Sequence, residues 1–495
     1  MRKQMKELTR EMFEARAGGG GIVPVYREYL ADMETPVSVL SRAVDEDVFL
    51  LESVASSETG GRYSFLGVNP YATVYEKDGT VFMQTPADGV SFLPDPDILA
   101  ALRRLFAERN FRVDPDLPPL QGGAIGYLSY DAVRVFEPRV KLEPEAGTPT
   151  AAFMLTDSIL VFDNVRRTVT VVVNVDAASP AAYDIARERI DALYAKFFRR
   201  ERPAMRFSVG GHGVPALPEK GFTPEMTAEE YADIVAKCKE DILNGECIQV
   251  VPSQKFTMET QASPVALYRA LRVVNPSPYN FFMKVGPRTM IGSSPEELVK
   301  LSGRTCSTCP IAGTRPRGAT PEADAALERE LVGDEKENAE HVMLVDLGRN
   351  DLGRVCETGT VKVDSFAHVE RYSHVMHLVS DVSGTLAEGK DGFDLLRAAF
   401  PAGTLTGAPK IRAMELIAQY EKSPRGIYGG AAGYFSFTGD MDFAIVIRTM
   451  ILDGTRLTMR AGAGIVADSD PVKEYNETVN KSKVVFEAAK FAETL

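Results

Sequence analysis

The sequence contains no apolar run long enough to cross a bilayer. No stretch of about 18 apolar residues occurs, so the chain is not expected to span a membrane. The first 21 residues carry charges throughout and lack an apolar core, unlike a secretory signal peptide. Only five cysteines occur in 495 residues, an odd and small number that is typical of a reducing compartment. These absences predict a cytoplasmic protein.

Positive charge is also in short supply. Lys and Arg total 56 against 69 Asp and Glu, which gives a formal net charge of -13. This balance argues against a nucleic-acid or membrane-surface binder, because anionic partners would be repelled at long range. If the substrate is itself anionic, the site must supply cations locally, as a metal ion, an arginine or a lysine.

Signatures of several catalytic classes are missing. Cys306 and Cys309 form a single CxxC with no second pair, so we expect two strand cysteines, with metal or redox use as the alternative. No cysteine lies between glycines in a nucleophile elbow, and no triad signature is visible. The loop at 401–410 is not a Walker A motif, because Ile411 stands where that motif has Ser or Thr.

A loop rich in glycine and proline at 202–224 is the clearest boundary in the chain. Before it, segments are short and often β-branched, with a buried strand predicted at 169–175 and a helix at 180–198. We therefore expect an N-terminal domain at 1–205, a linker at 206–224 and a second domain at 225–495.

The second domain opens with a well-marked helix. Thr227 and Glu230 have the spacing of a capping box, and Asn244 with Gly245 ends the apolar stripe. The following segments predict strands at 247–252, 279–285, 443–451 and 456–461, and helices at 322–347, 393–399, 409–420 and 472–491. Strands come in adjacent pairs between helices, which favours an α+β fold with antiparallel sheets over a regular βαβ alternation.

Two predicted helices each carry a pair of glutamates three residues apart. The pairs are Glu337 with Glu340, and Glu474 with Glu477. Residues three apart share a helix face, so each helix can point two carboxylates the same way, with Lys481 on the second face. Four carboxylates meeting across a cleft would bind a hard cation such as Mg²⁺. A solvated helix face is the ordinary alternative.

Arg448 stands inside the otherwise apolar strand predicted at 443–451. A charged group there must be paired or must contact a ligand, and both alternatives remain open. Farther along, Gly462, Ala463 and Gly464 offer backbone N–H groups where no long side chain blocks close approach. A guanidinium and backbone donors together would suit a carboxylate.

Glu296 and His377 each admit two interpretations. Glu296 follows Ser294 and Pro295, so it could complement the dipole at a helix start or act as a general acid. His377 could be an acid–base group or a satisfied core histidine.

Many ordered motifs together resemble the chorismate-utilising enzymes, and among them the large subunits of anthranilate synthase. In the second half the motifs are IQVVPSQ (248–254), NPSPY (275–279), GSSPE (292–296), PIAGTRPRG (310–318), DEKENAEHVMLVDLGRNDLGRV (334–355), YSHVMHLVSDVSG (372–384), FPAGTLTGAPK (400–410), RGIYGGAAGYF (425–435), IVIRTM (445–450) and AGAGIVADSDPVKEYNETVNK (461–481). The first half adds LLES (50–53) and GRYSFLG (61–67). The resemblance implies orthogonally packed antiparallel β-sheets flanked by helices, in agreement with the α+β expectation.

The resemblance also implies a Mg²⁺-dependent reaction that converts chorismate and ammonia to anthranilate and pyruvate. Glu340 and Glu477 would hold Mg²⁺ directly, with Glu337 and Glu474 assisting. The residues implied to bind the substrate are Arg448, Tyr428, Gly462, Ala463, Gly464, Lys481, Gly313 and Thr314. Thr404 would line the ring beside the reacting groups, Glu296 would protonate the departing C4 hydroxyl, and His377 would handle a proton in the elimination of pyruvate.

Two positions separate branches of the family. Isochorismate and salicylate synthases carry a lysine where this chain has Gln249, and aminodeoxychorismate synthases carry one in place of Ala312. With neither lysine, free ammonia is the expected nucleophile, so anthranilate synthase fits best. An aminodeoxyisochorismate synthase that stops before pyruvate elimination, an aminodeoxychorismate synthase and a catalytically silent chorismate-binding protein are the alternatives.

The resemblance further implies a partner and an inhibitor. The chain has no glutaminase elbow, so ammonia would come from a glutamine amidotransferase subunit, in a heterotetramer. A site for L-tryptophan as feedback inhibitor of tryptophan biosynthesis would comprise Ser53, Pro278, Tyr279 and Asn280. The family usually has methionine where Asn280 stands, so the strength of feedback is left open.

Overall fold

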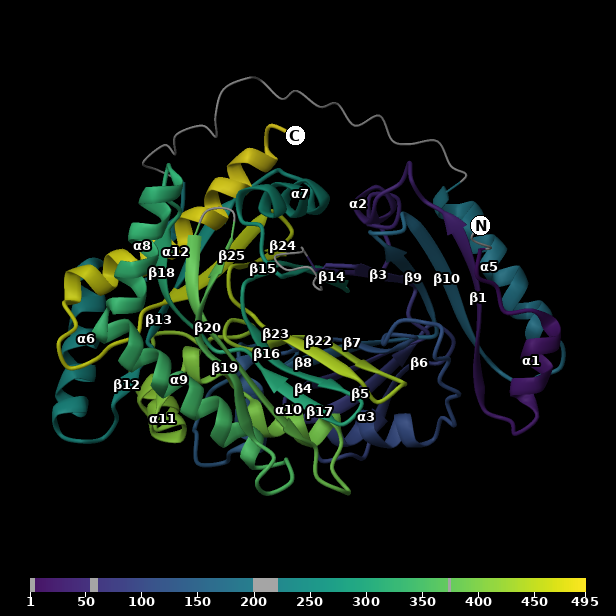
Figure 1. Cartoon of the computed structure of the whole chain (residues 1–495), viewed down its shortest axis with the longest axis horizontal. Helices are drawn as coiled ribbons and strands as arrows, with labels where there is room; N and C mark the ends of the chain where they lie inside the picture. The colour runs from purple at the N-terminus through teal and green to yellow at the C-terminus, as the bar shows by residue number, and fades with distance from the viewer. Residues whose placement is uncertain (1–4, 54–60, 199–220, 373–374) are drawn as a thin grey trace.

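The computed structural model describes residues 5–53, 61–198, 221–372 and 375–495. Two large antiparallel sheets face each other, and helices cover the outer face of each (Figure 1). The α+β fold class, with antiparallel sheets flanked by helices, is therefore confirmed.

Within those described ranges, the first sheet has 11 strands, which run in the order β1-β10-β9-β3-β2-β14-β15-β24-β25-β13-β11. Their bounds are β1 Ile22–Leu30, β10 Thr168–Asp176, β9 Ser158–Asp163, β3 Tyr63–Val68, β2 Val48–Glu52, β14 Tyr279–Val285, β15 Arg288–Ser294, β24 Thr449–Asp453, β25 Arg456–Gly462, β13 Ser253–Glu259 and β11 Thr223–Pro224.

The second sheet has 12 described strands, in the order β18-β20-β17-β16-β23-β22-β7-β8-β4-β5-β6, with β19 paired to β20. Their bounds are β18 Ile311–Pro316, β20 Val375–Thr385, β17 Thr305–Thr308, β16 Glu297–Ser302, β23 Met441–Ile445, β22 Ala431–Ser436, β7 Gly123–Leu128, β8 Ala151–Thr156, β4 Ala72–Lys77, β5 Thr80–Thr85, β6 Gly89–Leu93 and β19 Lys362–Arg371. A short pair, β12 Gln249–Val250 with β21 Gly407–Ala408, lies apart from both sheets.

The helices are α1 Arg10–Ala17, α2 Pro36–Leu40, α3 Ile98–Ala107, α4 Val133–Phe136, α5 Ala182–Phe198, α6 Ala228–Leu243, α7 Pro264–Val274, α8 Pro321–Gly333, α9 Glu335–Gly353, α10 Gly392–Ala399, α11 Lys410–Tyr420 and α12 Pro471–Ala492. Helices α7 and α12 pack on the first sheet, and α3, α9 and α10 on the second. A third apolar cluster, with Tyr127 from β7 and Phe281 from β14, fills the space between the sheets. The site described below therefore rests on two buried sheets and their helices.

Local sequence signals account for several of these elements. The valine-rich segment at 169–175 forms the buried strand β10, and α5 follows it. The capping box of α6 is complete, because Thr227 Oγ1 accepts from the Glu230 N–H at 3.3 Å and the Glu230 carboxylate accepts from the Thr227 N–H at 2.9 Å. Asn244 ends that helix as expected.

Four expected elements differ from the structure, and the first is the strand predicted at 247–252, of which only Gln249–Val250 forms a strand. The helix predicted at 322–347 is two helices, because Asp334 interrupts it and caps α9 by accepting the N–H groups of Lys336 and Glu337. The strand predicted at 443–451 is also two, β23 and β24, in different sheets. Pro409 is the N-cap of α11 rather than its first residue.

The two predicted domains share both sheets. Strand β2 of the first segment pairs with β14 of the second, and β7 pairs with β22. The segments at 1–205 and 225–495 therefore lie side by side in each sheet, rather than as two separate sandwiches. Most of the predicted linker, 206–220, lies outside the described residues. No helix in the part of the chain that is described has the length and apolar character to span a membrane.

Candidate active site

Glu296 and Arg448 each lie where the chain leaves one sheet and enters the other. Glu296 follows β15 of the first sheet and precedes β16 of the second, and Arg448 follows β23 of the second and precedes β24 of the first. The two crossings are hydrogen bonded to each other. The Ser293 N–H donates to the Arg448 carbonyl oxygen at 3.3 Å, and the Ile445 N–H donates to the Glu296 carbonyl oxygen at 3.1 Å. This paired crossing, which we call the seam, brings both residues together.

Two expectations about the seam residues are corrected by this arrangement. Arg448 is not inside a continuous strand, and its φ of 48° lies in the left-handed region that non-glycine residues rarely adopt. Such a backbone persists only when its surroundings fix it, and here the paired strands β23 and β24 hold the chain on both sides of Arg448. Glu296 does not begin a helix, because strand β16 follows it directly.

The carboxyl group of Glu296 stays protonated to a higher pH than the carboxyl group of an ordinary glutamate. Its side chain is 8% exposed. Burial raises the pKa of Glu296 to about 7, against smaller lowering effects from the Thr404 hydroxyl and the charges of Arg448 and Lys481. A carboxyl group with this pKa is protonated in a large fraction of molecules near neutral pH, so it can donate a proton.

Arg448 is a half-buried cation that forms no ion pair with any residue that the structure describes. Burial lowers the pKa of its guanidinium, and the nearby Glu296 opposes that effect. Among the described residues, its guanidinium makes no hydrogen bond or ion pair. A structural ion pair is thus not found, and the cation is available to an anionic ligand.

His377 is positioned by a bulge in strand β18. The register of β18 with β20 shifts between Ala312 and Thr314, and Gly313 at the bulge has a φ of 60°. The Gly313 carbonyl oxygen lies 2.9 Å from Nδ1 of His377, and Thr314 Oγ1 lies 3.0 Å from the same atom. A carbonyl can only accept, so Nδ1 carries the proton and Nε2 has the free lone pair. Burial lowers the pKa of His377, which favours this neutral form.

The end of strand β25 carries the glycines that the sequence singled out. A Cβ on Gly462 would lie 3.0 Å from the hydroxyl oxygen of Tyr428, so the tyrosine contacts bare backbone there. The Gly462 carbonyl accepts from Lys481 Nζ at 3.0 Å. The Ala463 N–H already donates to Pro252, while the N–H of Gly464 has no partner among the described residues. Of the three backbone groups, that of Gly464 is therefore the one open to a ligand.

The first predicted glutamate pair lies near the start of α9. Glu337 accepts from Arg315 Nη1 at 3.2 Å, and Glu340 accepts from Gln249 Nε2 at 3.1 Å. A Cβ on Gly464 would lie 3.9 Å from Glu340 Oε1, so this carboxylate faces the end of β25.

The second pair lies on α12. Glu477 is exposed and pairs with Lys481 at 2.7 Å. Glu474 is buried, and burial raises its pKa against the lowering effects of Ser469 and Lys336. Because Lys481 also contacts Gly462, Glu477 faces the same strand end as Glu340.

No group of three or more His, Cys, Asp or Glu side chains in the described ranges is gathered closely enough to hold a metal. The four glutamates therefore do not form the one cluster that was expected: Glu337 and Glu340 accept from Arg315 and Gln249, and Glu477 pairs with Lys481. Mg²⁺ is commonly held by one or two carboxylates, with water and ligand oxygens completing its octahedron. Glu340 and Glu477, on two helices that flank one strand end, fit that smaller donor set.

The residues expected to bind tryptophan are brought together by a different part of the first sheet. Strand β2 pairs with β14 so that Asn280 lies opposite Glu52, directly before Ser53. The Asn280 side chain is buried and its Nδ2–H donates to the Ser277 carbonyl at 2.8 Å. Tyr279 donates its hydroxyl to Glu297 at 2.9 Å, and Pro278 precedes it at the start of β14. The Asn280 side chain thus stabilises the turn at 277–280.

Two residues that donate to the predicted glutamates had no such part in the sequence analysis. They are Arg315, and Gln249, which served there only to separate branches of the family. Arg315 lies in the PIAGTRPRG motif, so its place in that motif was the available signal. A cavity of about 40 Å³ also lies beside Glu296, lined by Thr404, Leu347 and Gly348 among others.

Comparisons with known proteins identify the family of the chain. Residues 46–487 match the family model described as chorismate binding enzyme. The chain is 44% identical to anthranilate synthase component 1 of Pseudomonas putida, with 98% of each chain covered. It is 45% identical to the protein of that name from Acetivibrio thermocellus, over 94% of this chain and 95% of that one.

Two solved structures are also similar to this chain, one by name and fold and the other by fold alone. Anthranilate synthase component I from Streptococcus pneumoniae superposes with a TM-score of 0.75 at 36% identity, over 88% of this chain and 94% of that one. The menaquinone-specific isochorismate synthase from Escherichia coli, at 20% identity and a TM-score of 0.69, covers 97% of this chain and 98% of its own and shares the fold. The chain belongs to the chorismate-binding enzymes and, within them, to the anthranilate synthase component 1 family.

Proposed function

We propose that this chain is the large subunit of an anthranilate synthase, a lyase that converts chorismate and ammonia to anthranilate and pyruvate. The observation that carries the proposal is the seam, where a buried, protonatable Glu296 faces the unpaired guanidinium of Arg448. An anionic substrate held by the cation would present its leaving group to an acid. That combination suits a reaction in which a hydroxyl group must depart.

Arg448 would bind the enolpyruvyl carboxylate, assisted by the free N–H of Gly464. Tyr428 would form the wall behind that carboxylate, since its hydroxyl meets the backbone of Gly462. Lys481, which spans Gly462 and Glu477, would add a second positive charge at the same edge. Local cations of this kind offset the overall negative charge of the chain, which would otherwise repel a dianion.

Glu340 and Glu477 would hold Mg²⁺, with Glu337 and Glu474 in assisting positions. When bound, the metal ion neutralises the ring carboxylate and orients the substrate. The amide of Gln249 donates to Glu340, which restricts that side chain and leaves its carboxylate aimed at the end of β25. Orientation of a ligand side chain by such a partner is the usual role of a second residue at a metal site.

Glu296 would donate its proton to the C4 hydroxyl as that group leaves, while ammonia adds at C2. Thr404 would position the carboxyl group, because its buried hydroxyl has no hydrogen-bond partner among the described residues and lines the same small cavity as Glu296. The small cavity beside Glu296 has the size for a neutral molecule such as ammonia. General acid catalysis of this type contributes about 10²- to 10⁴-fold in rate.

His377 would accept a proton during the elimination of pyruvate. Its Nδ1–H is directed to Gly313, so the lone pair on Nε2 is the basic position, and burial keeps the ring neutral. Thr314 contacts the same nitrogen and would line the ring of the substrate.

The absence of two lysines supports ammonia as nucleophile over the alternatives. Gln249 cannot act as a base toward water, because an amide has no basic nitrogen at neutral pH. Ala312 is buried in β18, where a lysine would be needed for direct attack on the ring. We therefore favour anthranilate synthase over an aminodeoxychorismate synthase. An aminodeoxyisochorismate synthase, which omits the last elimination, is the second candidate.

The supply of ammonia and the feedback control are finer parts of the same proposal. A glutamine amidotransferase subunit would provide ammonia in a cytoplasmic heterotetramer, as the name component 1 of the relatives suggests. L-Tryptophan would bind near Ser53, Pro278, Tyr279 and Asn280, which the pairing of β2 with β14 brings together.

The proposal is tested by incubating the chain alone with chorismate, Mg²⁺ and an ammonium salt at mildly alkaline pH. Equal amounts of fluorescent anthranilate and pyruvate are expected. Consumption of chorismate without pyruvate would identify the aminodeoxyisochorismate synthase instead. If chorismate bound without being consumed, the chain would be a binding protein and the proposal would be wrong.

A further inference from the structure

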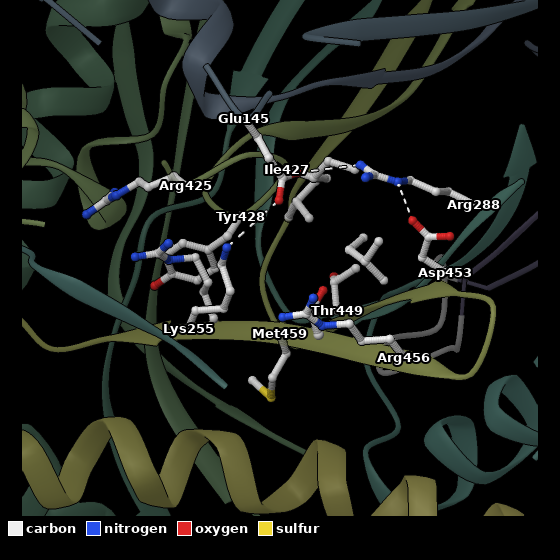
Figure 2. A pocket seen from close by; sticks show the side chains of 14 residues that line it. Glu145, Lys255, Arg288, Arg425, Ile427, Tyr428, Thr449, Asp453, Arg456 and Met459 are labelled. Carbon is white, nitrogen blue, oxygen red and sulfur yellow. Dashed lines mark hydrogen bonds and ion pairs between the residues drawn. The ribbon is translucent and has the colours of Figure 1, made fainter. Parts of the chain in front are cut away.

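A cavity of about 160 Å³ lies on the inner face of the first sheet, over strands β13, β24 and β25 (Figure 2). It is bounded on the far side by the segment that carries Glu145 and by Ile427 and Tyr428. None of the roles proposed above uses this space.

The cavity is separate from the seam. Glu296, Arg448 and Gly464 do not line it, whereas Tyr428 lines it and meets Gly462 with its hydroxyl. Tyr428 is therefore the wall between the cavity and the substrate site. The cavity also lies at the Arg288 end of β15, while Ser294 at the other end of that strand pairs with Tyr279 of the expected tryptophan site.

Three cations face the cavity, and one of them has no partner. Glu145 lies 3.8 Å from Lys255 and 3.5 Å from Arg288, both longer than hydrogen bonds. Arg288 also pairs with Asp453 at 3.1 Å. The guanidinium of Arg456 makes no hydrogen bond or ion pair within the described part of the chain, and Figure 2 shows it reaching toward the centre of the cavity.

The other two arginines that line the cavity already have partners, so they offer no free charge to a ligand. Arg425 and Arg460 are almost completely buried. Arg425 donates to Glu421 and to two carbonyl groups, and Arg460 donates to Ser253 and to the Ser423–Pro424 segment. Among the described residues, the free positive charge therefore comes from Arg456, whereas Lys255 lies near Glu145 and Arg288 is held by Asp453 and the Thr148 hydroxyl. In a chain with a net charge of -13, this is a local reversal of sign.

Much of the remaining lining is apolar, beside Thr449 and Thr458. Ile427, Val446 and Ile451 contribute hydrocarbon surface, and the Tyr428 ring completes it. A cavity with apolar walls and a few polar groups that converge at one side is the usual form of a small-molecule site. Inorganic anions gain nothing from the apolar walls, and a nucleotide needs a pocket several times larger.

We propose that this cavity binds a small ring-bearing carboxylate. The carboxylate would pair with the guanidinium of Arg456, in the fork geometry that arginine offers to carboxylates. The ring would lie on Ile427 and Ile451, against the face of Tyr428. The substrate and the product of the proposed reaction belong to this chemical class, but the inference rests on the lining of the cavity and not on that reaction.

Benzoate is the simplest probe of this class. We would titrate it by calorimetry into the full chain carrying Arg448→Gln, which weakens binding at the substrate site. One benzoate per chain is expected to bind. Adding Arg456→Gln should weaken this binding by about tenfold or more, since a charge-assisted contact to the carboxylate is lost. Arg349→Gln is the matched control, because Arg349 is an exposed arginine whose one ion pair among the described residues is with Asp346 of its own helix.

The outcomes separate clearly. No benzoate binding to the Arg448→Gln chain, or equal affinity with and without Arg456→Gln, would overturn the proposal. Competition by inorganic phosphate as strong as by benzoate would also overturn it, because the apolar walls would then contribute nothing. If Arg456→Gln lowered the thermal midpoint, Arg456→Lys would serve in its place, and a smaller loss of affinity is expected because lysine keeps the charge but lacks the fork of donors. Binding is measured without turnover, so failure of the proposed reaction would leave this result unchanged.

Discussion

Replacing Glu296 by Gln should change how the stability of the protein depends on pH. Glutamine keeps the size and hydrogen-bonding shape of the side chain but cannot ionise. In the wild-type chain, burial raises the pKa of Glu296 from 4.5 to about 7. The difference between wild type and Glu296→Gln therefore isolates the cost of ionising this one carboxyl group inside the seam.

The sign of the effect follows from proton binding. Below pH 4.5 the carboxyl group is protonated in both the folded and the unfolded chain, so its contribution to stability is fully present. Between pH 4.5 and 7 the unfolded chain loses this proton while the folded chain keeps it, so the free energy of unfolding falls as pH rises. One pKa unit corresponds to about 1.4 kcal/mol, so the total loss is about 3 kcal/mol. For a chain of this length, that is about 3 °C in the unfolding midpoint.

The measurement is the thermal midpoint of both proteins in matched buffers from about pH 4.5 to 8. The wild type should lose about 3 °C relative to Glu296→Gln across this range. Glu240→Gln, at an exposed position on α6, is the control and should follow the wild type. Parallel curves for wild type and Glu296→Gln would refute the reasoning, because the Glu296 carboxyl group would then ionise at its ordinary pH. In the same variant, turnover should fall by about 10² or more.

Three other changes test other parts of the structure. Glu340→Gln should abolish anthranilate formation at any Mg²⁺ concentration, and activity that returned at high Mg²⁺ would remove this residue from the metal site. Arg448→Gln should raise KM for chorismate about tenfold to 100-fold, as expected when a charged contact is lost, and an unchanged KM would contradict its role. Thr227→Ala should lower the free energy of unfolding by about 1 kcal/mol through loss of the α6 cap, measured by urea titration; an unchanged midpoint would show that this cap is not needed.

Much of the local structure could be read from the sequence, because its causes are local. The capping box at Thr227 and Glu230 and the valine-rich strand β10 depend on residues within one turn or one strand. The segments that hold the two glutamate pairs were predicted as helices, and the spacing of three residues then put each pair on one helix face. The motifs also identified the family before any geometry was known.

Other features depend on contacts between distant segments. The run at 443–451 has the composition of one buried strand, and nothing in it marks the crossing at Arg448 between two sheets. The loop at 202–224 suggested two domains, but nothing local shows that the strands before it and the strands after it form two adjacent blocks in each sheet, joined by the pairs β2–β14 and β7–β22. The cavity at Arg456 joins residues from several strands, so no single motif could have predicted it.

The sequence by itself determined the chemistry that is available: which carboxylates, which guanidinium and which histidine the chain can offer, and which lysines it lacks. Only the tertiary structure decided that Glu296 is a carboxyl group with a pKa near 7 and Arg448 a cation without a counter-ion. The physical reason is the seam. Two sheet crossings that are far apart in the chain bond to each other, and the burial they create changes the ionisation of both side chains.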